Sequence, residues 1–76
     1  MEINVARLRK KIDERHLTLP EFSRKIGINP STFYRKMERN GEGMTVGEVH
    51  KTVEVLELNE NEAINIFLPQ YSHLCE

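Results

Sequence analysis

The sequence predicts an all-α protein, a compact five-helix bundle, and three observations lead to this fold class. Apolar residues recur at helical spacing in five segments, each segment opens with a residue suited to cap a helix, and no stretch alternates like a strand. The chain has 76 residues, close to the lower limit at which a hydrophobic core alone stabilises a fold. We expect residues 1–69 to form this helical domain and residues 70–76 to form a short C-terminal tail.

The first helix is expected to begin after Asn4, because asparagine is a favoured N-cap. Val5, Leu8 and Ile12 follow at helical spacing and would form its buried face. The helix should end in the polar stretch 13–16.

Two further helices are expected between residues 18 and 37. Thr18 and Glu21 have the T-x-x-E spacing of a capping box, in which each side chain bonds the other residue's backbone N–H. Gly27 should end this second helix, because glycine adopts the left-handed C′ conformation without steric cost. Asn29 is then the predicted N-cap of the third helix, with Pro30 at its first position, where a missing N–H costs nothing.

The last two helices have the same start signal. Thr45 with Glu48 and Asn59 with Glu62 form capping-box patterns, and Pro69 follows the end of the fifth helix. The apolar faces are expected to consist of Val46, Val49, Val53 and Leu56 in the fourth helix and of Ala63, Ile66 and Phe67 in the fifth.

The second and third helices together satisfy the packing requirements of a helix-turn-helix over about residues 18–37. Such a motif needs a small residue where the helices cross, a glycine in the turn, an apolar residue at the corner and an inward-facing i, i+4 pair. The sequence supplies Ser23 at the crossing, Gly27 in the turn, Ile28 at the corner, and Phe33 with Met37 on the buried face.

The segment LTLPEFSRKIGINPSTFYRKM, residues 17–37, resembles the Cro/phage-repressor type of helix-turn-helix, the xenobiotic-response-element family. The segment MTVGEVHKTVEVLELNENEAINIFL, residues 44–68, is similar to the fourth and fifth helices of that family. The resemblance implies a lambda-repressor-like DNA-binding domain and operator DNA as ligand, frequently bound by a homodimer. It also implies a Cro-like or repressor-like regulator of phage or prophage origin.

The resemblance places the start of the third helix in the major groove. Arg35 is the main candidate for base reading, because a guanidinium can bond both O6 and N7 of guanine. Ser31 would bond a base edge, and Tyr34 would contact a phosphate or a thymine methyl. The family's phosphate clamp maps onto Thr18 and the N–H groups that follow it. The full set expected at the DNA is Thr18, Asn29, Pro30, Ser31, Thr32, Tyr34, Arg35, Lys36, Arg39, Asn40 and Thr45. The last four of these would flank the groove and contact the DNA backbone.

The charge is divided between the two halves of the chain. The formal net charge is −1, but residues 1–39 have a net charge of +5 and residues 40–76 a net charge of −6. Such a division either turns a basic face towards a polyanion or reflects ordinary solvated helix faces.

Several functional classes find little support in the sequence. Cys75 is the only cysteine, so an internal disulfide is excluded, and the three histidines lack metal-ligand spacing. No apolar run approaches the length of a membrane span and no signal peptide is evident, so we expect a cytoplasmic protein. No nucleophile, base and orienting group occur together, which argues against an enzyme, and no cofactor is expected.

Two alternatives concern partners. Leu19 stands where many members of the family have a phosphate-binding glutamine, and Pro30 stands where a base-reading residue is frequent. These departures favour a second hypothesis, a modulator or antirepressor that binds a partner repressor protein instead of DNA. Separately, the apolar residues of the C-terminal region would either form a homodimer contact or simply pack onto the first helix; these residues are Phe67, Leu68, Tyr71 and Leu74.

Overall fold

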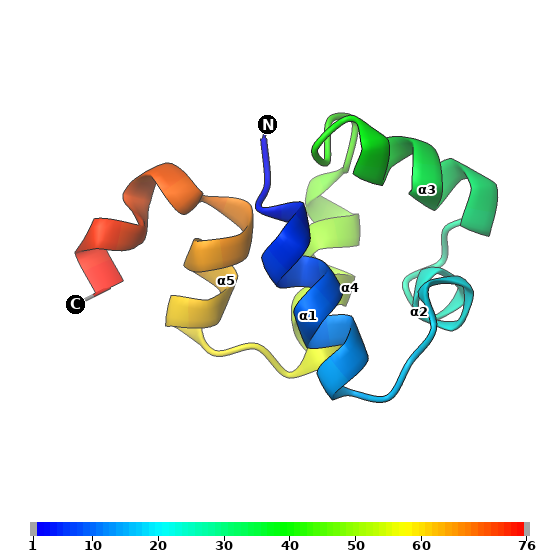
Figure 1. The fold of residues 1–76 in the computed structure, drawn as a ribbon, viewed down its shortest axis with the longest axis horizontal. Coiled ribbons are helices and arrows are strands. Elements are labelled where there is room, and N and C mark those ends of the chain that lie inside the picture. Colours follow the sequence, from blue (N-terminus) through cyan, green and yellow to red (C-terminus); the bar gives the residue numbers. More distant parts are fainter. Residues whose placement is uncertain (1, 76) are drawn as a thin grey trace.

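The computed structural model describes residues 2–75, and its side chains are described through residue 72. Its α-helices are α1 (Val5–Glu14), α2 (Leu19–Lys25), α3 (Pro30–Glu38), α4 (Val46–Leu56) and α5 (Glu60–Phe67), and a 3-10 helix, η1 (Pro69–Cys75), follows. Residues 2–75 contain no strand, so the predicted all-α class and its five helices are confirmed. In Figure 1, α1 lies in the middle with α5 on its left, the α2–α3 pair on its right and α4 behind it.

The predicted helix starts are confirmed, because each N-cap side chain accepts a hydrogen bond from a backbone N–H of the first turn. These interactions satisfy donors that would otherwise lack an intrahelical partner. The capping boxes of α2, α4 and α5 are complete in both directions; they consist of Thr18 with Glu21, Thr45 with Glu48, and Asn59 with Glu62.

The hydrophobic core joins all five helices. The rings of Phe22 and Phe33 connect α2 to α3, with centroids 5.6 Å apart and an interplanar angle of 60°, a tilted arrangement favoured by aromatic quadrupoles. Leu8 and Ile12 are fully buried on α1. The remaining buried apolar side chains of the described region are Ile3, Ile26, Ile28, Met37, Leu56, Ile66 and Phe67.

The turn between α2 and α3 has the expected construction. Gly27 has a φ of +81°, the left-handed conformation that ends α2, and Ile28 is buried directly after it. Ser23 is fully buried, and its hydroxyl donates a 2.8 Å hydrogen bond to the carbonyl of Pro20. A small side chain here lets the two helices approach, and its polar atom is satisfied within its own helix.

A contact that the sequence did not indicate ties the chain's start to the loop after α3. The backbone N–H of Ile3 donates to the carbonyl of Asn40 at 2.8 Å, and that of Asn4 donates to Ile66 at 2.7 Å. The side chain of Ile3 is buried against Gly41, where a Cβ atom would lie 2.5 Å from Ile3 Cγ1. The segment before α1 therefore connects the end of α3 to α5.

Three expectations need correction. Val46, expected on the buried face of α4, is 87% exposed, because it is the first residue of the helix and lies at the edge of the apolar face. Thr52 of the same helix is fully buried. Its hydroxyl donates a hydrogen bond to the carbonyl of Glu48. Phe67, expected at an exposed dimer contact, is only 4% exposed and its side chain belongs to the core. Residues 70–75 of the segment expected as a tail belong to η1, which begins at Pro69 and packs against α5.

Candidate nucleic-acid interface

The outward face of α3 is defined by the residues that do not pack into the core. Phe33 and Met37 are buried on the opposite side. Helical spacing places Ser31, Arg35 and Glu38 on one exposed strip, and Tyr34 beside it is 41% exposed. The α2–α3 turn and the core fix the orientation of this strip, so its side chains are presented on a rigid support.

The first turn of α3 is organised by Asn29. The side-chain oxygen of Asn29 accepts hydrogen bonds from the backbone N–H of Ser31 at 2.9 Å and from the Ser31 hydroxyl at 2.6 Å. The hydroxyl of Ser31 therefore keeps its lone pairs available to accept from a ligand donor. Pro30 is half-buried in this turn and contributes rigidity rather than a polar contact.

Arg35 has no acidic partner within the described part of the chain. Its nearest polar contact is the hydroxyl of Thr32, at 3.5 Å, which is at the outer limit for a hydrogen bond. Arg39 caps the C-terminal end of α3 and also forms no ion pair with a described residue. Both arginines line a shallow hollow beside α3, which the structure builds from Thr32, Arg35, Lys36, Arg39, Glu42 and Gly43.

Lys36, expected at the DNA backbone, is engaged within the protein. Its ammonium lies 2.8 Å from Oε1 and 3.0 Å from Oε2 of Glu48, and both side chains are only 19% exposed. Burial raises the pKa of Glu48, but hydrogen bonds from Lys36 and the Thr45 backbone outweigh burial, so the net shift is downward. A phosphate contact by Lys36 would first require this pair to separate.

The other expected contacts have local structural roles. The hydroxyls of Thr18 and Thr45 accept hydrogen bonds from Glu21 and Glu48 within their capping boxes. Asn40 has a φ of +55° just after α3, and its carbonyl bonds the N-terminal segment. All three residues are exposed, yet none lies on the outward strip of α3.

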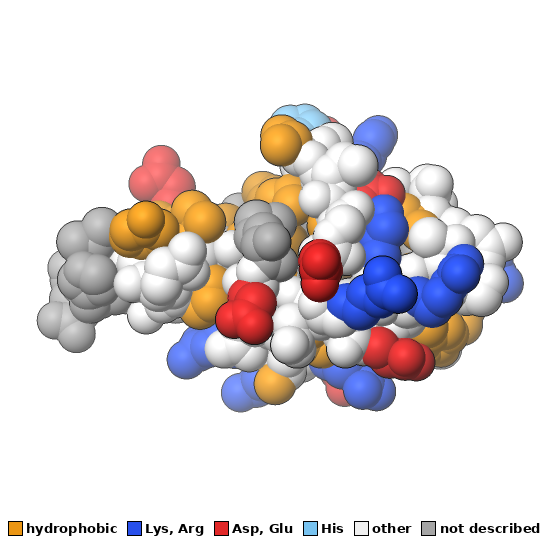
Figure 2. Space-filling model, turned by 90° about the horizontal axis from the view of Figure 1, so that it is seen from above, with side chains coloured by type: hydrophobic (Ala, Val, Ile, Leu, Met, Phe, Trp, Pro, Cys, Tyr) orange, Lys and Arg blue, Asp and Glu red, His pale blue; other side chains and the backbone are white. Residues whose placement is uncertain are grey.

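The surface around α3 is basic but not uniformly so. Figure 2, which views the molecule from the α3 side, shows Lys and Arg side chains gathered over the half that contains α3, with acidic side chains between them. Glu38 belongs to the outward strip itself, three residues after Arg35. This carboxylate was overlooked in the sequence, although its helical spacing from Arg35 could have revealed it. Because Glu38 is the last residue of α3, the part from Ser31 to Arg35 is better suited to a polyanion.

Comparison of the chain with models of protein families, with curated proteins and with solved structures found no match. No helix within the described residues is long and apolar enough to cross a membrane. The same residues hold no group of three or more His, Cys, Asp or Glu side chains arranged to bind a metal ion.

Proposed function

We propose that the protein is a sequence-specific DNA-binding transcriptional regulator whose recognition helix, α3, enters the major groove with the part from Pro30 to Arg35. The observation that supports this proposal most is Arg35, an exposed guanidinium with no described ion-pair partner, on a helix whose opposite face is locked into the core. An α-helix fits the major groove of B-DNA, and arginine is the side chain most used there to read guanine.

Four exposed side chains of α3 and its C-cap have defined roles in this proposal. Arg35 forms paired hydrogen bonds to one guanine, and the Ser31 hydroxyl accepts a hydrogen bond from the neighbouring base edge. Tyr34 contacts a thymine methyl or a phosphate, and Arg39 neutralises a backbone phosphate beyond the groove edge. Lys36 is left out of the contact set, because Glu48 holds its ammonium.

A second candidate function has its own structural observation. An open apolar groove is lined by Met44, Val46, Val49, Phe67 and Leu68. Val46 is 87% exposed and Leu68 is 40% exposed at its edge, and exposed apolar surface of this kind is typical of protein contacts. A modulator that binds a partner repressor protein would use such a surface. Leu74, expected at a homodimer contact, lies outside the residues whose side chains are described, and Tyr71 is 49% exposed.

Fluorescence anisotropy with labelled duplexes from the region flanking the gene distinguishes the two functions. We expect saturable binding that weakens between 50 and 200 mM salt, with a log–log slope of about −0.9 for each phosphate neutralised. Arg35→Ala should weaken binding by about 1–3 kcal/mol. Arg9→Ala, which removes an exposed arginine from α1, is the matched control and should have little effect. Specific DNA binding has a dissociation constant well below about 10 µM. If no saturable binding occurs below about 10 µM at either salt concentration, the proposal is contradicted and the protein partner is favoured.

A further inference from the structure

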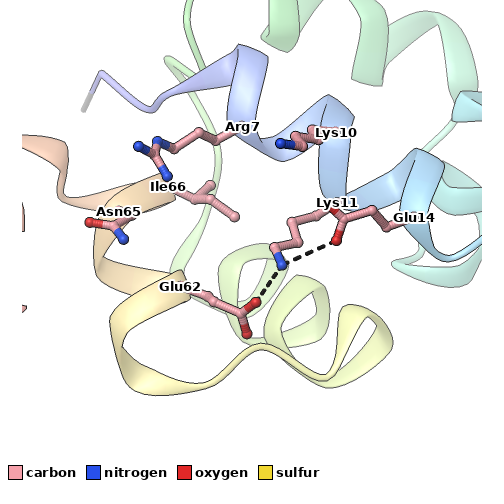
Figure 3. Close-up of a pocket in the computed structure, with 7 residues that line it drawn as sticks. All are labelled: Arg7, Lys10, Lys11, Glu14, Glu62, Asn65 and Ile66. Carbon is pink, nitrogen blue, oxygen red and sulfur yellow. Dashed lines mark hydrogen bonds and ion pairs between the residues drawn. The ribbon is translucent and has the colours of Figure 1, made fainter.

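The facing sides of α1 and α5 form a charged groove that the proposed DNA contact does not use. On α1, the charged side chains follow the i, i+3, i+4, i+7 spacing of a single helix face. Three residues of α5 face them at i, i+3 and i+4. Together they line a hollow of about 190 Å³, shown in Figure 3; the lining residues are Arg7, Lys10, Lys11, Glu14, Glu62, Asn65 and Ile66.

At one end of this groove the cation is paired within the protein. The ammonium of Lys11 bonds the carboxylate of Glu62 across the two helices, and it also contacts Glu14 Oε1 at 3.3 Å. The hydrogen bond with Glu62, and then the one with Glu14, raise the pKa of Lys11. The bond from Lys11, followed by the N-cap backbone of Asn59, lowers the pKa of Glu62. Lys11 therefore has its countercharges in the protein.

The other end of the groove has cations without countercharges. Arg7 and Lys10 form no ion pair within the described part of the chain, and both side chains are exposed. In Figure 3 the Arg7 side chain extends from α1 towards Asn65, above Ile66, and the Lys10 ammonium points to the same side. The residue that α5 presents here is the neutral Asn65, whereas one turn earlier it presents the carboxylate of Glu62. Two like charges at i, i+3 repel each other unless an anion lies between them.

We infer that the open end of this groove binds a small ligand that bears a phosphate group, with Arg7, Lys10 and Asn65 as its donors. The guanidinium of Arg7 presents parallel N–H groups that match two phosphate oxygens. Lys10 supplies a second positive charge, and the amide N–H of Asn65 can donate to a third oxygen. A hollow of about 190 Å³ is smaller than the usual pocket for a drug-sized ligand, so the phosphate is the main recognised group.

This site is independent of the DNA contact. In Figure 1, α5 lies on one side of α1 and the α2–α3 pair lies on the other, and α1 packs against both α5 and α2. A ligand between α1 and α5 would leave the outward strip of α3 open. The measurement below contains no DNA, so its result does not depend on the proposed function.

The test is an NMR titration of ¹⁵N-labelled protein with inorganic phosphate at constant ionic strength, adjusted with sodium chloride. We expect saturable shifts in the amides of α1 and α5, and at least about tenfold weaker binding for the double variant Arg7→Gln/Lys10→Gln, because two charge-assisted contacts are removed. Arg9→Gln removes a charge from the opposite side of α1 and should bind like the wild type. Amide spectra of the variants without ligand verify that each is folded.

Two ligands distinguish free phosphate from a phosphate monoester. Uridine monophosphate should shift the same residues as inorganic phosphate, and tighter binding by it would identify a nucleotide-like monoester as the preferred ligand. Uridine without the phosphate should produce no saturable shift. Shifts spread equally over all basic surfaces, unchanged binding by the double variant, or saturable binding of uridine alone would each overturn the inference.

Discussion

Lys36 on α3 and Glu48 on α4 form a paired contact in which one ammonium lies within 3.0 Å of both oxygens of one carboxylate. The same carboxylate accepts a 2.9 Å hydrogen bond from the N-cap backbone of Thr45. Glu48 therefore closes the first turn of α4 and holds the last turn of α3 with a single side chain. The position of the outward strip of α3 depends on this contact as well as on the buried rings of Phe22 and Phe33.

Lys36→Met should lower stability more than it lowers DNA affinity. Because both side chains are four-fifths buried, we expect a coupling of about 1 kcal/mol, between that of exposed and fully buried pairs. A double-mutant cycle with Glu48→Gln, which keeps an acceptor for the Thr45 N–H, measures this coupling in urea unfolding. The salt slope of DNA binding should be unchanged in Lys36→Met but smaller by about 1 in Arg39→Ala. A reduced slope in Lys36→Met without loss of stability would show that the lysine binds phosphate.

Gly41 and Gly43 provide a matched pair for the contact with the N-terminal segment. Both have positive φ values, +82° and +88°, so an alanine is strained at either position. Only at position 41 would the new Cβ meet the side chain of Ile3; nothing lies within 4 Å at position 43. We expect Gly43→Ala to cost about 1–2 kcal/mol and Gly41→Ala to cost about 1–3 kcal/mol more. Equal losses in thermal or urea unfolding would contradict the close packing of Ile3.

Acid should destabilise the fold through the capping glutamates. The Thr18 backbone N–H lowers the pKa of Glu21, and Lys11 with the Asn59 backbone lowers that of Glu62, both from an ordinary value of 4.5. A carboxyl group whose pKa is lower in the folded than in the unfolded state stabilises the folded state above pH 4.5. This stabilisation is lost as the pH falls through the pKa of the folded state. Melting temperatures should therefore decline below about pH 4.5.

Substitution by glutamine isolates this contribution, since glutamine still accepts from the N-cap N–H but does not titrate. Glu21→Gln and Glu62→Gln should each flatten the acid branch of the stability curve. Glu60→Gln on α5 is the control, because Glu60 is exposed and forms no ion pair with a described residue. An acid branch as steep in both capping variants as in the wild type would disprove the explanation.

Glu38→Gln should strengthen DNA binding. Glu38 lies on the outward strip of α3, one turn from Arg35, where its carboxylate repels an approaching phosphate backbone. Removing one exposed charge of this kind should raise affinity by about two- to fivefold at low salt. Anisotropy titrations at two salt concentrations measure the change, and the gain should shrink at the higher one. If affinity does not change, the end of α3 at Glu38 lies far from the DNA.

The local features of the fold were predictable because they depend on residues close in sequence. The N-caps at Asn4, Thr18, Asn29, Thr45 and Asn59, and the turn at Gly27, follow from short-range hydrogen bonding and backbone sterics. The burial of Phe33 and Met37 follows from helical spacing. These elements suffice to locate the outward strip that contains Arg35.

The features that the sequence did not reveal depend on packing between distant segments. Lys36 and Glu48 are twelve positions apart in the sequence, and only the folded arrangement of α3 and α4 brings them together. The hydrogen bond from Ile3 to Asn40 and the burial of Phe67 likewise require the assembled fold. Val46 was misplaced because periodicity fixes the direction of a face but does not fix how far the core extends along the helix.

The most direct test of DNA reading by α3 is selection of binding sites from a pool of duplexes with randomised sequence. We expect the wild-type protein to enrich a shared motif that includes a guanine. Arg35→Ala should lose the preference at that one base pair while retaining the rest of the motif, because a guanidinium specifies guanine through O6 and N7. Enrichment of no motif by the wild-type protein, or of an identical motif by Arg35→Ala, would contradict base reading by this helix.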